Sequence, residues 1–505
     1  MQNDILIIGS GLGGLTAGAK LAKEGKRVLL IEQHHTVGGC ATTFNRKNFT
    51  VEAGLHEIDG LNEDDPKTQI FKELGVFDKV EFVKIPEFYR FTNGRVDIVI
   101  PDDMEEATKN LIKRFPDEAS GIRKFFQTIT RLNREVARLP GENWKMKLLL
   151  PFFPLLYRNI LVNVNRTVGD FVDSIISNED LKLVLLANIG YYHDDPHTMS
   201  LLSFAIPQGS FYSGANYIKG GSQKLSDYLA EVIRLNGGQV LTGQLVTRII
   251  TENGKATGVK YKKTVGKDVE EQEAYANTII ANAAIPNVAN EMLPPLEKKL
   301  LQRQVDKFKP SCSLLSIYFG FRKPLRDLGN RHYSTFVFDE SVKELSQLIE
   351  NMKDTDYNRK GYVFVDYSQI DSGLTAIDRS LGVIVTVDYL CNWENLTDEA
   401  YKKKKEEVAQ IYIDKLERLI PGSKKEIEYC EVGTPKTIQR YTKNPEGTAY
   451  GYAQTPQQAN VKRVDHKSPI GNLYFASAWT KPGGGFTGAI LSGYNCADTI
   501  LDQRS

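Results

Sequence analysis

Three glycines and one carboxylate near the start of the chain have the types and the spacing that bind a dinucleotide. Gly9, Gly11 and Gly14 form a G-x-G-x-x-G motif, and Glu32 follows 18 residues after the last of them. The glycines permit a tight turn and let a pyrophosphate approach the backbone, while the carboxylate can accept hydrogen bonds from a ribose. This pattern predicts dinucleotide binding.

The segments around these residues predict a strand, a helix and a second strand. Residues 5–8 are an apolar run of the length of a buried parallel strand. A helix is expected from Gly14 to about Glu24, and a strand over residues 27–31 leads to the carboxylate. The helix would direct its free N–H groups and the positive end of its dipole toward the phosphates. The glycine motif is therefore far more specific here than it would be alone.

Later stretches match the needs of a whole FAD molecule. Gly38 and Gly39 form a paired glycine shortly after the carboxylate, a pattern familiar from flavoproteins. Near the C-terminus, a strand over residues 473–476 and a glycine loop over residues 483–485 precede a helix expected to begin near Gly488. The N-terminus of that helix could face the pyrimidine end of a flavin and stabilise negative charge there.

The composition argues against several other classes of function. The 64 basic and 63 acidic residues leave a net charge of +1, so no nucleic-acid partner is expected. Five dispersed cysteines without a C-x-x-C pair indicate free thiols in a reducing compartment. Only His193 and His197 have the i, i+4 spacing of metal ligands on a helix, and Pro196 interrupts a helix there, so they are interpreted as part of a loop or turn and no metal is expected. The N-terminus enters a strand without a secretory signal, which favours the cytoplasm.

The chain resembles the phytoene desaturase superfamily of FAD-dependent enzymes. The motifs that carry the resemblance stand in the family's order from end to end: "IIGSGLGGLTAG", "IEQHHTVGGCATTF", "GLHEI", "FPDEASGIRKFF", "YIKGGSQKL", "TPKTIQRYTKNPEGTAYG" and "TKPGGGFTGAILSG". Within the superfamily, the chain is more similar to carotenoid isomerase and retinol saturase. The first and last motifs are specific to flavin, and the ordered set is hard to obtain by chance.

The resemblance implies an α/β fold with two discontinuous domains. A Rossmann-type, glutathione-reductase-like FAD-binding domain would take residues 1–75, 215–290 and 435–505. An α+β substrate domain would take residues 76–214 and 291–434. The lysine run 402–405 is interpreted as a solvated helix face.

The same resemblance places the FAD contacts. They would fall on Gly9, Gly11, Leu12, Gly13, Gly14, Glu32, Gln33, Gly38, Gly39, Cys40, Val246, Ala283, Ala478, Phe486 and Thr487. Many relatives have Gly-Asp where this chain has Ser477-Ala478, so a carboxylate contact to the ribityl chain is expected to be missing. Some carotene desaturases also lack that acid, and FAD is still the expected cofactor.

The family acts on carbon–carbon double bonds of long apolar polyenes, so the resemblance implies a carotenoid or retinoid enzyme that desaturates, saturates or isomerises its substrate. The flavin carries the redox step, and the site is expected to be an apolar tunnel with very few polar groups. His56 and Glu57 in "GLHEI" are the catalytic candidates, because relatives hold this segment near the isoalloxazine. His56 could donate a proton, steady the flavin or be a structural histidine, and Glu57 could be an acid or an ordinary exposed or paired carboxylate. Tyr450, Tyr452 and Lys481 are interpreted as structural.

An apolar stretch stands out in the substrate domain. Leu148 to Leu156 run for nine residues without a polar side chain, fewer than the about 20 that a spanning helix needs. The flanking residues Trp144, Lys145, Lys147, Tyr157 and Arg158 could lie at headgroup depth. A peripheral contact with the inner face of the membrane is therefore expected, with a tunnel lining or simple core as the alternative.

Other functions remain open from the sequence. A flavin amine oxidase would share the FAD domain but needs an aromatic cage; the chain keeps Trp479 but not the paired aromatics. A non-catalytic lipid-binding flavoprotein and an enzyme of another unsaturated lipid are further alternatives. The one other G-x-G-x-x-G, formed by Gly483, Gly485 and Gly488, lies in the C-terminal glycine loop and opens no second strand–helix–strand unit, which gives no support for a nicotinamide site. The particular polyene, the direction of the reaction, the electron acceptor or donor and the oligomeric state are undetermined.

Overall fold

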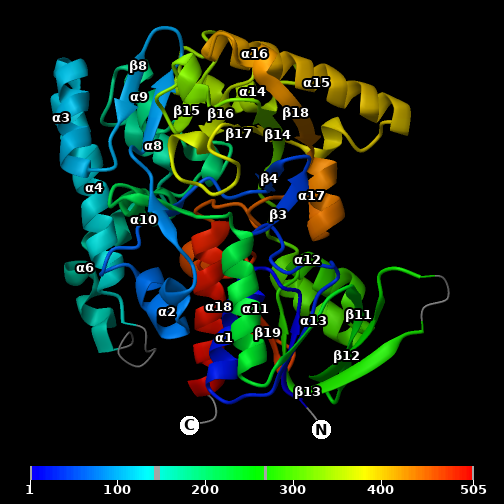
Figure 1. The fold of residues 1–505 in the computed structure, drawn as a ribbon. Helices are drawn as coiled ribbons and strands as arrows, with labels where there is room; N and C mark the ends of the chain where they lie inside the picture. Colours follow the sequence, from blue (N-terminus) through cyan, green and yellow to red (C-terminus); the bar gives the residue numbers. More distant parts are fainter. Residues whose placement is uncertain (1–2, 141–147, 267–269, 503–505) are drawn as a thin grey trace.

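The computed structural model describes residues 3–140, 148–266 and 270–502, and these residues build two large sheets, one above the other in Figure 1. The first sheet has the strand order β10-β2-β1-β13-β12-β11, with β19 paired to β13. Its strands are β1 (Asn3–Ile8), β2 (Val28–Ile31), β10 (Gln239–Leu241), β11 (Gln244–Glu252), β12 (Lys255–Lys263), β13 (Gln272–Ala281) and β19 (Leu473–Phe475).

The centre of this sheet is parallel and buried, as the apolar run at the N-terminus predicts. Ile5 of β1 pairs with Val28 of β2 on one side and with Thr278 of β13 on the other. Helix α1 (Leu12–Lys23) follows β1 directly and begins two residues before the expected start. It packs beside α11 (Gln223–Leu235) and the C-terminal helix α18 (Gly485–Asp502), which begins three residues earlier than expected (Figure 1). Residues from both ends of the chain thus share one layer.

A glycine lets α1 and α18 approach closely. A Cβ added at Gly493 would lie 2.2 Å from the carbonyl oxygen of Gly13. The Gly493→Val variant is expected to lose roughly 1–3 kcal/mol of stability, because overpacking forces the two helices apart. The midpoint of thermal unfolding measures this loss. Asn495→Val, at an exposed position of the same helix, is the control and should change the midpoint little.

The second sheet is largely antiparallel and has the order β18-β14-β17-β16-β15-β7-β8, in which β15 and β7 run parallel. Its strands are β7 (Tyr89–Thr92), β8 (Asp97–Ile100), β14 (Ser313–Phe321), β15 (Ser334–Val337), β16 (Tyr362–Asp366), β17 (Ser380–Asp388) and β18 (Ile427–Gly433). Two smaller sheets contain β3 (Thr43–Arg46) with β4 (Phe49–Glu52), and β5 (Ile58–Asp59), β9 (Ala215–Ile218) and β6 (Phe82–Lys84).

The remaining helices cover these sheets. They are α2 (Pro66–Leu74), α3 (Met104–Arg114), α4 (Ala119–Ala137), α6 (Phe153–Leu156), α7 (Arg158–Asn163), α8 (Val168–Asp173), α9 (Glu179–Leu185), α10 (Leu201–Phe211), α12 (Ile285–Asn287), α13 (Pro295–Val305), α14 (Leu348–Lys353), α15 (Asp398–Leu419), α16 (Ser423–Glu426) and α17 (Pro435–Thr442). Among the described residues, none of the helices is both long and apolar enough to cross a membrane. The division into two discontinuous domains stays a prediction.

Candidate active site

One cavity of about 3350 Å³ brings together residues from every part of the chain. Its lining includes all of the expected site residues except Gly14: Gly9, Gly11, Leu12, Gly13, Glu32, Gln33, Gly38, Gly39, Cys40, His56, Glu57, Val246, Ala283, Ala478, Phe486 and Thr487. A Cβ at Gly14 would lie 2.4 Å from the carbonyl oxygen of Gly9, so this glycine serves the close packing of helix on strand.

The phosphate end of the cavity lies at the start of α1. Gly11 is the N-cap residue of the helix, and no side chain caps it. The first N–H groups of the helix therefore face the cavity, where they suit an anion. A Cβ at Gly11 would meet the side-chain amide of Asn282, whose nitrogen would be nearest at 2.8 Å, and would otherwise fill space that a pyrophosphate needs.

Glu32 is held at the end of β2 by hydrogen bonds. Its carboxylate accepts from the backbone N–H of Ser10 at 2.7 Å, from the Ser10 hydroxyl at 2.6 Å and from the N–H of His34 at 2.8 Å. Because the side chain is buried and lines the cavity, its orientation is fixed toward the position of a ribose.

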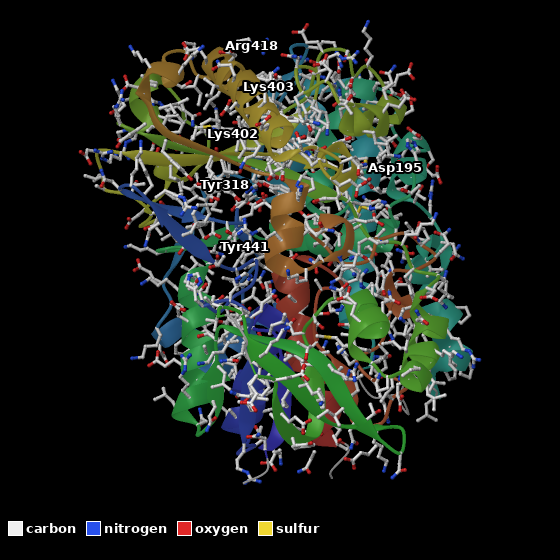
Figure 2. All side chains as sticks on the ribbon, turned by 90° about the vertical axis from the view of Figure 1, so that its right-hand side faces the viewer. Asp195, Tyr318, Lys402, Lys403, Arg418 and Tyr441 are labelled. Carbon is white, nitrogen blue, oxygen red and sulfur yellow. The ribbon has the colours of Figure 1, made fainter. Side chains whose placement is uncertain are left out.

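The end of α17 contacts the loop that follows Glu32. The carbonyl oxygen of Tyr441 lies 2.7 Å from Nε2 of His34 and accepts from the Gln33 amide at 3.1 Å. Figure 2 shows Tyr441 at the end of α17 that points toward the first sheet, with Tyr318 of the second sheet above it. The segment that follows the second sheet thus contacts the loop after Glu32.

The flavin end of the cavity is formed by the C-terminal glycine loop and the start of α18. Phe486 and Thr487 lie in the first turn of that helix, and the Thr487 hydroxyl donates to the Asp59 carboxylate at 2.5 Å. The backbone N–H of Ser477 donates to Ser492, and Ala478 lines the cavity where many relatives have an acid. The residues present therefore fit a dinucleotide with a flavin at this end.

The imidazole of His56 is neutral and already has a hydrogen-bond partner. Its Nδ1 lies 2.9 Å from the Tyr191 hydroxyl, and its backbone carbonyl accepts from the Tyr333 hydroxyl at 2.5 Å. Burial lowers the pKa of the imidazole to about 4. A proton-donating His56 at neutral pH is therefore disfavoured, and the structural interpretation fits this residue better.

Glu57 differs from its neighbour. Its Oε2 is buried and has no hydrogen-bond partner among the described residues, yet the side chain lines the cavity. Burial, and next the negative charge of Asp59, raise the pKa of this carboxyl well above its ordinary value. These surroundings favour the protonated form of the carboxyl group, which can give its proton to a bound molecule.

Charged residues that the sequence interpretation missed lie close by. Lys67 contacts the carboxylates of Asp65 at 2.7 Å and Asp59 at 3.3 Å, and all three side chains are buried and line the cavity. They depart from the expected tunnel with very few polar groups. No spacing rule joins them, although "EIDG" carries Asp59 two residues after Glu57.

Another arm of the cavity is apolar and reaches the surface. Leu150, Phe153, Ile160, Leu161 and Val164 line it. The same segment exposes an apolar patch, which we define as Leu148, Leu150, Phe152, Leu155, Leu156, Leu161 and Val162. Leu155 is 81% exposed, which excludes the simple-core interpretation of this stretch.

The residues on either side of the patch, which were expected at headgroup depth, differ in their exposure. Tyr157 is buried and donates its hydroxyl to the carbonyl of Arg138, so its placement at headgroup depth is wrong. Arg158 is exposed, as that prediction requires. Trp144, Lys145 and Lys147 lie outside the described residues.

The lesser candidates have mainly structural surroundings. Tyr452 packs against Trp479 with ring centroids 4.8 Å apart, and Lys481 pairs with Asp465 at 2.8 Å. Tyr450 abuts the glycine loop, because a Cβ at Gly484 would lie 2.4 Å from its carbonyl oxygen. Nε2 of His193 lies 3.0 Å from the Thr198 hydroxyl and Nε2 of His197 lies 2.9 Å from Asp173, within the turn before α10.

Comparisons with known proteins agree with this geometry. The family model described as flavin containing amine oxidoreductase matches residues 12–501. An all-trans-retinol 13,14-reductase of Danio rerio is 28% identical over 99% of this chain and 86% of its own length. A chloroplastic prolycopene isomerase of Daucus carota is 26% identical over 100% of this chain and 82% of its own length. The solved structure of a cyclohexylamine oxidase from Brevibacterium oxydans has a TM-score of 0.61 at 15% identity and covers both chains fully (100% each), which supports the expected α/β fold.

Proposed function

Because the chain belongs to the family of flavin-containing amine oxidoreductases, we propose that it acts on the carbon–carbon double bonds of an apolar polyene. The substrate would be a carotenoid or a retinoid, and the reaction a desaturation, a saturation or a cis–trans isomerisation. The two relatives are named for a retinol and for a prolycopene, both polyenes, and this supports the proposed substrate class.

The observation that carries the proposal is the continuity of the cavity. Its lining runs from the dinucleotide loops through Glu57 to the apolar arm at Leu150 and Leu161, where the apolar patch begins. Burial of a long hydrocarbon chain in such an arm is favourable, by about 25 cal/mol for each Å² of apolar surface removed from water. A small polar substrate would not cover the apolar lining of this arm.

The cofactor of this enzyme is FAD, as the sequence predicts. We propose that the start of α1 and Gly38–Gly39 hold its pyrophosphate, that Glu32 holds a ribose, and that Ala478, Phe486 and Thr487 lie along the flavin half. When bound, FAD supplies the two-electron chemistry at the double bond. The chain itself binds and orients the substrate, excludes water and handles protons.

We assign the proton-handling role to Glu57 and a positioning role to His56. Glu57 presents to the cavity a carboxyl whose pKa is raised by burial and whose Oε2 has no hydrogen-bond partner among the described residues. His56 fixes Tyr191 through its Nδ1 and so shapes the wall of the site beside that carboxyl. The first sheet with α1, α11 and α18 would form the FAD domain, and the second sheet would form the substrate domain.

The apolar patch is proposed to contact the membrane from the cytoplasmic side, which would let the substrate enter directly from lipid. Each exposed leucine contributes about 1.5–3 kcal/mol when it is buried in an apolar phase. Leu148→Asp combined with Leu155→Asp should therefore weaken binding to lipid vesicles by roughly a hundredfold or more. Cosedimentation with phosphatidylcholine and phosphatidylglycerol vesicles measures this. Leu235→Asp, at a leucine of α11 that is 74% exposed, is the control; an equal loss there would contradict the assignment.

An absorbance titration under anaerobic conditions tests the proposed substrate class. Carotenes, retinol and simple amines are added separately to the FAD-loaded protein, and the flavin bands are followed. Polyenes are expected to perturb or bleach the flavin, whereas amines are expected to leave it unchanged. Bleaching by an amine with no response to any polyene would favour the amine oxidase alternative.

A further inference from the structure

The apolar cavity contains a chain of buried charged groups that apolar substrate binding does not require. Asp65, Lys67 and Asp59 are in contact, and their side chains are 4%, 2% and 9% exposed. Buried ion pairs contribute little net stability, because desolvation of the charges offsets their attraction. The presence of these ion pairs beside a reactive site therefore calls for an explanation other than stability.

The chain of contacts has two ends. At the outer end, Asn62 and Asp64 are exposed and line the cavity next to Asp65, so water can reach this end. At the inner end, Asp59 accepts a hydrogen bond from Thr487 at the start of α18. Asp59 and Glu57 are two residues apart in the sequence and both line the cavity, and the charge of Asp59 adds to burial in raising the pKa of Glu57.

A purely structural role explains only part of this arrangement. Asp65 caps α2 by accepting from the backbone N–H of Lys67, and that contact needs no lysine ammonium. Lys67 directs its ammonium both to Asp65, at 2.7 Å, and to Asp59 of β5, at 3.3 Å. The ammonium thus joins the helix cap to the carboxylate that contacts Thr487.

We propose that Asp65, Lys67 and Asp59 form a proton path between solvent and the reaction site, ending at Glu57 and at Thr487. This inference rests on the proposed function. A change of two hydrogens moves one hydride, whose electron pair goes to or comes from the flavin, and one proton. Glu57 gives that proton to a substrate carbon or takes it from one, and the path returns Glu57 to its starting state by exchange with solvent. The apolar arm of the cavity offers no such route for protons.

Proton uptake on flavin reduction tests the path without any polyene. The FAD-loaded protein is photoreduced by flashes in weak buffer with an added sacrificial amine, which supplies the electrons. Flavin absorbance reports the electrons and an indicator dye reports the protons, after subtraction of the protons that the oxidised amine releases in a control with free FAD. In the unaltered protein, proton uptake should keep pace with reduction. In Lys67→Met and in Asp59→Asn, uptake should lag behind reduction at least tenfold, and Lys67→Arg should restore much of the rate.

Lys72→Met is the matched control, because Lys72 lies on the same helix and pairs with Glu63 at the surface. It should behave like the unaltered protein. Asp59→Asn preserves side-chain volume and keeps the test decisive if Lys67→Met does not fold. Uptake as fast as reduction in Asp59→Asn would overturn the path. Because the readout involves no substrate, a failure of polyene turnover would count against the proposed function and not against this inference.

Discussion

Replacement of Glu57 by glutamine is expected to slow polyene turnover by about 10²- to 10⁴-fold, the usual contribution of a positioned acid or base. Glutamine has the shape of the protonated carboxyl but cannot release a proton. Since Oε2 of Glu57 has no hydrogen-bond partner in the described structure, the exchange removes no hydrogen bond at that oxygen. FAD content and folding should therefore be retained, and steady-state turnover with a polyene measures the loss.

The pH dependence of this variant provides a second readout. The pKa of Glu57 is raised in the folded protein, so between its unfolded and folded values the native state binds more protons than the unfolded state. Stability of the unaltered protein consequently falls as pH rises through that window. Glu57→Gln should gain stability relative to the unaltered protein at pH 8, and much less at pH 4.5. Unchanged turnover together with unchanged stability at both pH values would show that Glu57 is an ordinary exposed carboxylate.

The Gly11→Val variant is expected to fold and to lose FAD affinity by roughly a hundredfold or more, which corresponds to about 3 kcal/mol. The backbone of Gly11 has φ −62° and ψ 167°, values that other residues adopt readily. A side chain here displaces only the Asn282 amide but occupies the approach to the first N–H groups of α1. Flavin content after reconstitution, together with circular dichroism, separates binding from folding.

Gly13→Val provides the contrast for this test. Its Cβ would lie 2.4 Å from the backbone carbonyl oxygen of Ala476, which cannot move without disturbing the strand before the glycine loop. That variant should fail to fold as well as fail to bind. A Gly11→Val protein that retains full flavin content would contradict the placement of the pyrophosphate at α1.

The dinucleotide half of the site follows from local sequence. The apolar strand, the glycines and Glu32 lie within one short segment, so their spacing alone places the glycines around the turn from β1 to α1 and Glu32 directly after β2. The same holds for the C-terminal loop and α18, whose start was misplaced by only three residues. The pattern of apolar residues repeats too few times within one element to predict where a helix or strand begins or ends to the exact residue.

The proton-handling part of the site follows from tertiary contacts instead. Lys67 looks like a surface lysine near the start of an amphipathic helix, and only the fold of the chain between β5 and α2 brings Asp59 to it. The patch at Leu148 to Leu156 is a mixed case. Its sequence indicates apolar contact, but the burial of Tyr157 depends on its contact with the end of α4, which sequence does not reveal.

The mass of a polyene after incubation with the FAD-loaded protein tests the central claim most directly. Carotenes and retinol are offered to the protein with oxidised and with reduced flavin, and the products are separated by chromatography before mass spectrometry. A change of two hydrogens, or an unchanged mass at a shifted retention time, is the predicted result. Unaltered mass and retention for every polyene, from protein that carries its full complement of FAD, would contradict the account.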